Sequence, residues 1–122
     1  MNKVVHFEIP TSDLKKAQDF YGAVFGWQMM PFDDDNVMTS TTEVDENFMP
    51  KEPGAINGSF YKGASGHTPH VVVEVPDIQA HIELVKQHGG SLLVDVQTVP
   101  NMGMYCRCKD PEGNLVGLWQ NL

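Results

Sequence analysis

The sequence has little positive charge, few cysteines and no long apolar run. Only 8 of its 122 residues are lysine or arginine, against 16 acidic residues, and the net charge is −8. The chain therefore lacks the basic clusters typical of proteins that bind nucleic acid or anionic membranes. No apolar segment reaches the roughly 18 residues of a membrane-spanning helix, and no signal-peptide pattern begins the sequence. We predict a cytoplasmic protein without nucleic-acid or membrane partners.

The scarcity of cysteine excludes a disulfide framework. Cys106 and Cys108 are the only two cysteines, and their spacing places both on one face of a strand. A bridge between neighbours at this spacing would strain the backbone. A Cys-x-Cys pair could form half of a metal site, but a second pair is absent from the sequence. We therefore expect both thiols to be buried as small apolar side chains.

The first half of the chain predicts a strand, a helix and three further strands. Alternating apolar and polar residues over 4–9 indicate a strand that ends at Pro10. Asp13 is a suitable N-cap, and Gly26 closes a helix whose apolar residues follow at helical spacing. Strands are expected over 27–32, 37–44 and 55–61, with a charged, proline-containing loop over 45–54.

The second half repeats this pattern. A strand over 70–76 ends at a proline, and Asp77 caps a helix that closes at 88–90. Strands follow over 91–99, 102–109 and 115–120. The segment 110–113 has Asp, Pro and Gly at the positions that favour a tight turn.

The two copies point to one α+β domain over residues 1–122. His6 and His70 each come seven residues before the aspartate that begins the helix, and this offset relates the copies 1–62 and 68–122. Each βαβββ unit is too small to bury its own core well. We therefore predict that they pair into a curved eight-stranded mixed sheet with both helices on its convex side. The concave side would form a cavity for a small molecule.

Two motifs resemble a known family. The segment 20–27, Phe-Tyr-Gly-Ala-Val-Phe-Gly-Trp, and the segment 109–114, Lys-Asp-Pro-Glu-Gly-Asn, are similar to the vicinal oxygen chelate superfamily. That superfamily includes glyoxalase, bleomycin-resistance proteins and extradiol dioxygenases. The resemblance covers nearly the whole chain and points to a glyoxalase-related branch. It indicates the fold but not one activity, since the superfamily contains both metal-dependent enzymes and metal-free binding proteins.

The resemblance implies where a divalent metal would bind. In the family, one metal ligand comes from the first strand and one from the last strand of each copy. The first-strand ligands correspond to His6 and His70, but the last-strand ligand of the second copy corresponds to Gly117. In the first copy, an alignment without a gap places this ligand at Gly58. If Ile56 and Phe60 are core residues, Asn57 and Ser59 point inward instead, and the sequence leaves this strand register open. Since two imidazoles alone hold a metal poorly, we expect no cofactor, or a weakly bound Zn, Fe, Mn or Ni ion. The alternative is that the two histidines are hydrogen-bonded cavity residues.

The resemblance also places Tyr105 and Arg107 in the cavity, and strand alternation places Glu8 there with His6. An inward arginine needs an anion, so Arg107 either pairs with Glu8 or binds an anionic group of a substrate. The expected substrate-binding residues are Tyr105, Trp119, Leu115 and Phe60, although Trp119 fits a core role equally well.

These residues favour a glyoxalase-related lyase or isomerase that acts on a small oxygenated metabolite. Glu8 or His6 would be the base and Arg107 the anion clamp. The alternative is a non-catalytic binding or drug-sequestering protein of the bleomycin-resistance type. We also predict a homodimer whose contact involves the loop 45–54, because Phe48 and Met49 would expose an apolar spot there. The same loop could instead be a lid.

Overall fold

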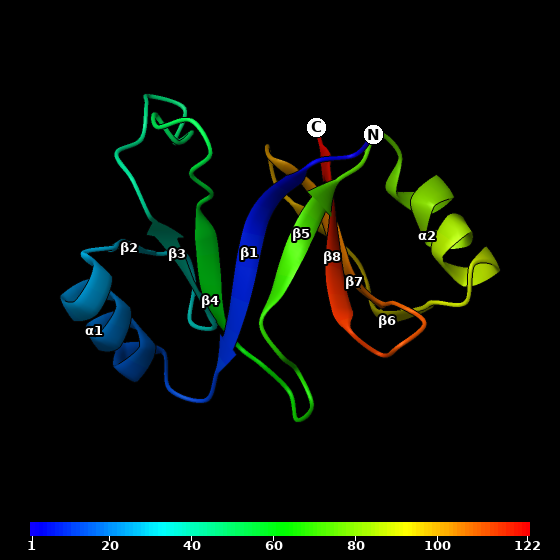
Figure 1. The fold of residues 1–122 in the computed structure, drawn as a ribbon, viewed down its shortest axis with the longest axis horizontal. Coiled ribbons are helices and arrows are strands. Elements are labelled where there is room, and N and C mark those ends of the chain that lie inside the picture. Colours follow the sequence, from blue (N-terminus) through cyan, green and yellow to red (C-terminus); the bar gives the residue numbers. More distant parts are fainter. The chain divides into compact units, whose positions relative to one another are not determined.

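The protein has eight strands and two helices in the order expected from the repeat (Figure 1). The computed structural model describes residues 1–122. The elements are β1 Val4–Thr11, α1 Leu14–Phe25, β2 Gln28–Pro31, β3 Asn36–Ser40, β4 Gly58–Lys62, β5 His70–Glu74, α2 Ile78–Gln87, β6 Ser91–Val99, β7 Gly103–Lys109 and β8 Leu115–Asn121. The strands form one open mixed sheet in the order β2-β3-β4-β1-β5-β8-β7-β6. This confirms the α+β fold class.

The residues group into two compact units that differ slightly from the sequence repeats. The first-half unit contains residues His6–Pro69, and the second-half unit contains Met1–Val5 together with His70–Leu122. The N-terminal residues join the second half because the main-chain N–H of Glu74 donates to the carbonyl of Lys3 at 2.9 Å. β1 therefore contributes residues to both units.

Local capping determines the ends of α1. The Asp13 side chain accepts a hydrogen bond from the main-chain N–H of Lys16 at 3.1 Å, which satisfies a donor that has no partner within the helix. At the other end Gly26 adopts φ 73°, and its N–H donates to Gly22 at 3.0 Å. Both ends agree with the sequence prediction.

β3 and β4 are shorter than predicted, whereas β1 continues through Pro10 to Thr11 instead of ending at the proline. β3 ends at Ser40 rather than at residue 44, and β4 begins at Gly58 rather than at residue 55. The cause is a change of hydrogen-bond partner. The N–H of Thr41 donates to the side chain of Asn57 at 3.0 Å, and its hydroxyl donates to the carbonyl of Ile56 at 2.8 Å. These contacts replace the regular ladder.

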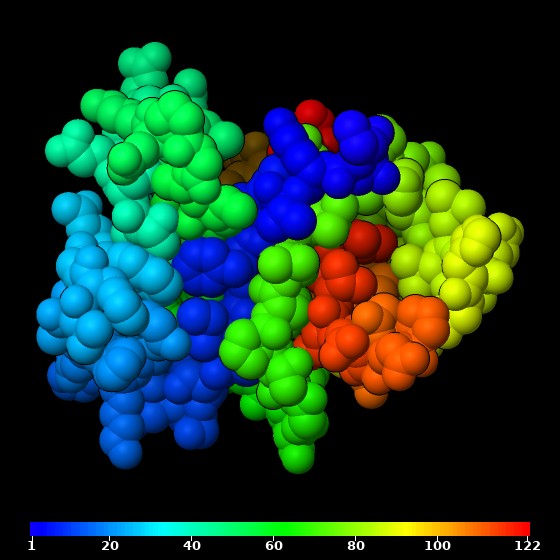
Figure 2. All heavy atoms as spheres, viewed as in Figure 1, coloured from blue at the N-terminus to red at the C-terminus, as the bar shows by residue number.

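A loop projects from the first-half unit between β3 and β4. In Figure 2 its atoms form the teal to green protrusion at the upper left. The loop is closed by a bridge between Val44 and Pro50, and the Asp45 carboxylate accepts hydrogen bonds from the N–H groups of Asn47 and Met49. Phe48, at its tip, has φ 61° and is 65% exposed. The loop therefore presents an apolar side chain from an ordered turn.

α1 packs on β2 and β4 less completely than its apolar spacing suggests. Tyr21 stacks on Trp27, with ring centroids 5.0 Å apart, and also contacts Phe60 at 5.0 Å. Val24 and Phe25, however, are each 57% exposed, and no residue of α1 is fully buried. The aromatic residues next to the helix bury one edge of its apolar stripe and leave the rest at the surface.

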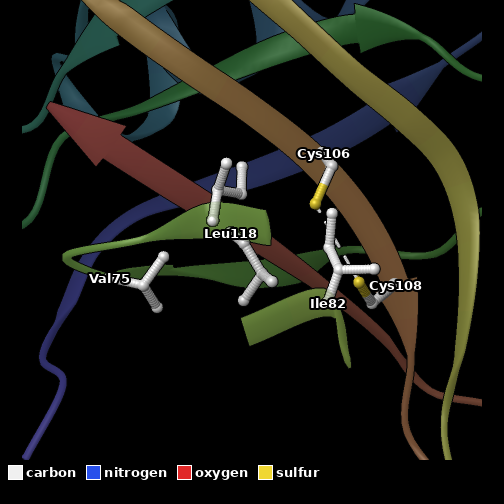
Figure 3. Close-up of a cluster of buried hydrophobic side chains, with 6 residues drawn as sticks. Val75, Ile82, Cys106, Cys108 and Leu118 are labelled. Carbon is white, nitrogen blue, oxygen red and sulfur yellow. Dashed lines mark hydrogen bonds between the residues drawn. The ribbon is translucent and has the colours of Figure 1, made fainter. Parts of the chain in front are cut away.

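The second-half unit has the more completely buried core. α2 is capped by the Asp77 carboxylate, which accepts from the N–H of Ala80 at 3.0 Å. Its inner face meets β7 and β8 in a cluster drawn in Figure 3, formed by Val75, Ile78, Ile82, Cys106, Cys108 and Leu118. The cysteines are therefore buried as predicted. Val71 on β5 is 46% exposed and is not part of this cluster.

The turn between β7 and β8 is built around one carboxylate. Asp110 accepts hydrogen bonds from the N–H groups of Glu112 and Asn114, each at 2.9 Å, and from the Asn114 side-chain amide at 3.0 Å. Gly113 completes the predicted turn with φ 85°. The bonds from Asn114 are the main reason that the pKa of Asp110 lies below its ordinary value of 3.8.

Neither helix is long and apolar enough to cross a membrane. The cytoplasmic location stays a prediction from the sequence.

We predict that Asp110→Asn lowers the melting temperature at neutral pH, because the NH₂ group that replaces one carboxylate oxygen cannot accept the bond from the Asn114 side-chain amide. A lowered carboxylate pKa stabilises the fold above the ordinary pKa of 3.8, and this contribution disappears as the pH falls through the folded-state value. The difference in melting temperature between the wild type and the variant should therefore shrink on acidification below that pH. Glu112→Gln removes a charge from the same turn and is the control. A difference that stays constant into acid would contradict the assignment.

Candidate functional site

In the first-half unit, strand pairing brings His6, Glu8 and Ser59 to one face. β1 and β4 are parallel, with Glu8 opposite Ser59 and Phe7 opposite Gly58. Because side chains alternate along a strand, His6 and Glu8 share the face of Ser59, whereas Phe7 shares the face of Gly58. The register that the sequence left open is thereby resolved. It is Ser59, not Gly58, that accompanies the predicted site residues.

This polar face carries groups that can exchange a proton. The His6 Nε2 and the Ser59 hydroxyl share a hydrogen bond of 3.2 Å. Glu8, which lies opposite Ser59 in the strand pairing, is buried, with 8% of the residue exposed. Ser59 is buried as well. A carboxylate removed from bulk solvent beside an imidazole and a hydroxyl is a common arrangement for general acid–base chemistry. Sequence reasoning weighed Ser59 only as one register alternative.

The opposite face of the same strands is an aromatic core. Phe60 is completely buried and contacts both Tyr21 and Trp27, and Phe7 lies against Trp27 with ring centroids 5.5 Å apart. Phe60 was expected to contact a ligand, but the structure places it on the face that packs on α1, because it is one residue out of phase with Ser59. A Cβ at position 58 would overlap the Phe7 ring, so a larger residue there would force this ring to move.

In the second-half unit, Arg107 and Tyr105 lie on the face of β7 opposite its cysteines. In the antiparallel pairing with β8, Tyr105 lies opposite Trp119 and Arg107 lies opposite Gly117. His70 shares this face through the alternation of β5, in which Val72 is paired with Gly117. Arg107 and His70 are buried, with 7% and 8% exposed. This face therefore holds two groups able to bind an anion.

Tyr105 is held in place by its neighbours. Its hydroxyl donates to the Gln97 side chain at 2.6 Å, and the Arg107 guanidinium carbon lies 5.5 Å from the centre of its ring. A cation at that distance from an aromatic ring is attracted to the ring face. Gln97, on β6, was not among the predicted residues, because only the β6–β7 register shows that it lies opposite Tyr105.

Trp119 ends a short hydrogen-bond chain on the same face. Its indole N–H donates to the Asn121 side-chain oxygen at 2.7 Å, and the Asn121 amide donates to Glu74 at 2.6 Å. Lys3 lies 3.8 Å from the same carboxylate. The polar edge of Trp119 is thus fixed, and its ring stays on the face of Tyr105. Leu115 lies on this face too, opposite Lys109, and is buried.

A depression of ≈ 530 Å³ in the second-half unit contains none of the predicted site residues. It lies near the chain ends and is lined by Met1, Asn2, Lys3, Glu74, Val75, Pro76, Gln120 and Asn121.

The positions that the family resemblance implies as last-strand metal ligands hold unsuitable side chains. Gly117 has no donor atom, and the first-half position is occupied by the neutral hydroxyl of Ser59. Within either unit, no group of three or more His, Cys, Asp or Glu side chains lies together. Zn²⁺, Fe²⁺, Mn²⁺ and Ni²⁺ are usually held by imidazole, thiolate or carboxylate ligands. Gly117 and Ser59 therefore do not fit a resident metal at these positions.

Comparison with known proteins agrees with this architecture. Residues 3–118 match the Glyoxalase family, described as the Glyoxalase/Bleomycin resistance protein/Dioxygenase superfamily. A glyoxylase-like domain-containing protein from Didymella fabae is 30% identical over 111 residues, which cover 88% of this chain and 84% of that protein. The chain therefore belongs to the Glyoxalase/Bleomycin resistance protein/Dioxygenase superfamily.

Solved structures with the same fold are much more distant in sequence. A superfamily member from Vibrio splendidus 12B01 has 15% identity and a TM-score of 0.64, with all of both chains covered. A Streptomyces coelicolor methylmalonyl-CoA epimerase in complex with 2-nitronate-propionyl-CoA has 15% identity and a TM-score of 0.68. It covers 99% of this chain and 98% of its own. At this identity the similarity shows the fold alone.

We predict that Gly58→Ala destabilises the protein by about 1–3 kcal/mol, since the added methyl group overlaps the Phe7 ring and the core must shift. Gly22→Ala is the matched control. Its Cβ would lie 3.6 Å from the nearest atom, the carbonyl oxygen of Trp27. In the helix interior alanine should be more stable than glycine by about 0.5–1 kcal/mol. Urea unfolding of the two variants measures both effects, and equal stabilities would refute the proposed packing of Phe7.

Proposed function

We propose that this protein binds a small oxygenated organic anion and catalyses a proton transfer at a carbon atom of that anion. Glu8 or His6 is the base, and Arg107 binds the anionic group. The observation that carries the proposal is the buried Glu8 carboxylate beside the His6–Ser59 hydrogen bond. A purely structural face of a sheet would favour apolar residues at these positions, because a buried carboxylate is costly to desolvate.

The chemistry follows from the groups on the two polar faces. A carboxylate or imidazole removes a proton from a carbon next to a carbonyl group, and the electron pair moves to the carbonyl oxygen. Return of the proton to the same carbon, or to its neighbour, gives an epimerase or an isomerase. Loss of a leaving group gives a lyase. Arg107 suits a carboxylate or phosphate group of the substrate, because its guanidinium offers two parallel donors.

Methylmalonyl-CoA is a suitable first probe. Solved structures with this fold include methylmalonyl-CoA epimerases, one of them in complex with methylmalonyl-CoA. The molecule carries a free carboxylate and an exchangeable proton beside two carbonyl groups, so it tests both proposed roles. The similarity in fold supports this choice of probe.

We predict that the protein binds methylmalonyl-CoA and exchanges its C–H proton for deuterium in D₂O, as followed by NMR. Glu8→Gln should slow exchange by about 100-fold with little loss of binding, because the amide is not a base. His6→Gln tests the alternative base in the same way. Arg107→Lys should weaken binding by about tenfold, since lysine keeps the charge but loses the two-point contact. The exposed Glu112, in the turn between β7 and β8, supplies the control Glu112→Gln.

The alternative is a binding protein without catalysis, as the bleomycin-resistance part of the superfamily description suggests. The polar faces also suit this function, because Trp119 and Tyr105 offer aromatic surface beside Arg107. Calorimetric titration with bleomycin as well as methylmalonyl-CoA separates the two functions. Tight binding of either probe without any deuterium exchange favours sequestration, and no binding of either argues against the proposed function.

We further propose that the protein forms a homodimer through the loop 45–54. Phe48 and Met49 are both largely exposed at the tip of a loop that its own hydrogen bonds hold in shape. Exposed apolar side chains on an ordered loop are typical of contact surfaces.

We predict that Phe48→Asp converts a dimeric mass into a monomeric one in light scattering, because the buried carboxylate would oppose association. Met102→Asp places the same charge at another exposed apolar residue and is the control. If Phe48→Asp keeps the dimeric mass but weakens ligand binding, the loop is a lid. A monomeric wild type at micromolar concentration would exclude the dimer.

A further inference from the structure

Cys106 and Cys108 form a close pair of thiols within the core of the second-half unit. Both side chains extend from the same face of β7, and their sulfur atoms are joined by a hydrogen bond of 4.0 Å (Figure 3). Both residues are completely inaccessible to solvent, packed with Ile82 and Leu118. The pair takes no part in the proton transfer proposed above.

The two thiols are chemically unequal. The hydrogen bond between them raises the pKa of Cys106 and lowers the pKa of Cys108. Burial opposes the shift at Cys108, and the nearby ammonium group of Lys86 adds to it. Because the thiolate is the reactive form of cysteine, Cys108 is the better nucleophile of the two.

The residue between the cysteines is Arg107, the only arginine in the chain. Its side chain leaves β7 on the opposite face from the two sulfur atoms. Any change in the backbone that joins the cysteines must therefore act on the residue proposed to bind the anionic group of the substrate.

The sheet around Arg107 is irregular on one side. Its partner on β8 is Gly117, which has no side chain. Its partner on β6 is Val94, and the register of β6 with β7 shifts on both sides of this residue. Bulges of this kind mark places where a ladder is already interrupted and the strand can bend. On the β6 side, a local contraction of β7 would therefore meet a ladder that is already interrupted, whereas its pairing with β8 is regular.

We propose that Cys106 and Cys108 form a reversible disulfide on oxidation by a hydroperoxide, and that this disulfide displaces Arg107 and so regulates anion binding. The regulatory half of this inference rests on the role proposed for Arg107 above. The redox half depends only on the positions of the two sulfur atoms.

The oxidation balances with hydrogen peroxide as the oxidant. The Cys108 thiolate attacks one oxygen of the peroxide, the O–O bond breaks, and hydroxide leaves while Cys108 becomes a sulfenic acid. The Cys106 sulfur then attacks the Cys108 sulfur, its proton goes to the departing oxygen, and water is released. In sum, two thiols and one peroxide yield one disulfide and two water molecules. A thiol reductant reverses the reaction by disulfide exchange.

Geometry couples the bond to Arg107. Cα atoms two residues apart along a strand are separated by about 6.6–6.8 Å, whereas those joined by a disulfide are most often about 5.5–6 Å apart. The sulfur atoms must also approach from 4.0 Å to a bond length of about 2 Å. At the most common disulfide spacing β7 would be shorter at Arg107, and this would change the direction of its side chain.

The first experiment detects the bond without any ligand. The reduced protein is treated with hydrogen peroxide, and its intact mass should fall by two hydrogen atoms and recover with dithiothreitol. Trypsin cleaves after Arg107, so the two cysteines leave in separate peptides unless a disulfide joins them. In Cys106→Ala the remaining thiol should yield a sulfenic acid that dimedone traps. Cys108→Ala tests the other thiol in the same way.

The second experiment follows Arg107 itself. As the only arginine, it contributes a single Nε–H resonance in protein labelled with ¹⁵N-arginine, and this resonance should shift on oxidation and return on reduction. Affinity for methylmalonyl-CoA should fall by about tenfold in the oxidised protein, the factor expected for loss of the two-point contact. The Cys106→Ala/Cys108→Ala double variant should show neither change.

The outcomes separate the two proposals. An intact mass that rises by oxygen atoms would overturn the disulfide. So would the absence of linked peptides from the folded protein under conditions in which the unfolded protein is oxidised. A disulfide that leaves the Arg107 resonance in place overturns the regulation. If the reduced wild type does not bind methylmalonyl-CoA, the proposed substrate is wrong. The intact mass still tests the disulfide, and the Arg107 Nε–H resonance still tests whether the disulfide displaces Arg107.

Discussion

The register between neighbouring strands governs the rest of this structure, because it decides which side chains meet a helix and which face away from it. Glu8 lies opposite Ser59, and Arg107 lies opposite Gly117. A shift by one residue would turn Glu8 toward the aromatic residues that pack on α1. The large apolar side chains prevent this shift. Phe60 is completely buried, so the polar residues next to it in sequence are directed to the other face.

Core and site are therefore two sides of the same strands rather than separate regions. In β7 the consecutive residues Cys106, Arg107 and Cys108 alternate between the cluster under α2 and the polar face. Any distortion of the core side is transmitted through a single peptide unit, since no side chain can move along a strand without its neighbours. This close coupling is what makes a redox event in the core relevant to a ligand on the opposite face.

Glycine has opposite consequences at two of these positions. At Gly58 the missing side chain makes room for Phe7, and the packing of the first-half unit depends on it. At Gly117 it leaves the position between Arg107 and Val72 without a donor atom. The superfamily fold is thus kept although this strand position offers no side chain for a ligand or a metal.

The sequence by itself determined the local features of this protein. Short-range hydrogen bonds determine the helix caps at Asp13 and Asp77 and the turn at 110–114. Residue periodicity determines the succession of strands and helices along the chain. Alternation also determined that Arg107 faces away from the two cysteines. Only the tertiary structure decided that Ser59 joins Glu8, that Gln97 holds Tyr105, and that part of α1 stays exposed. These features depend on pairing between residues distant in sequence, and a periodic pattern fixes a side chain's face without specifying its partner across the ladder.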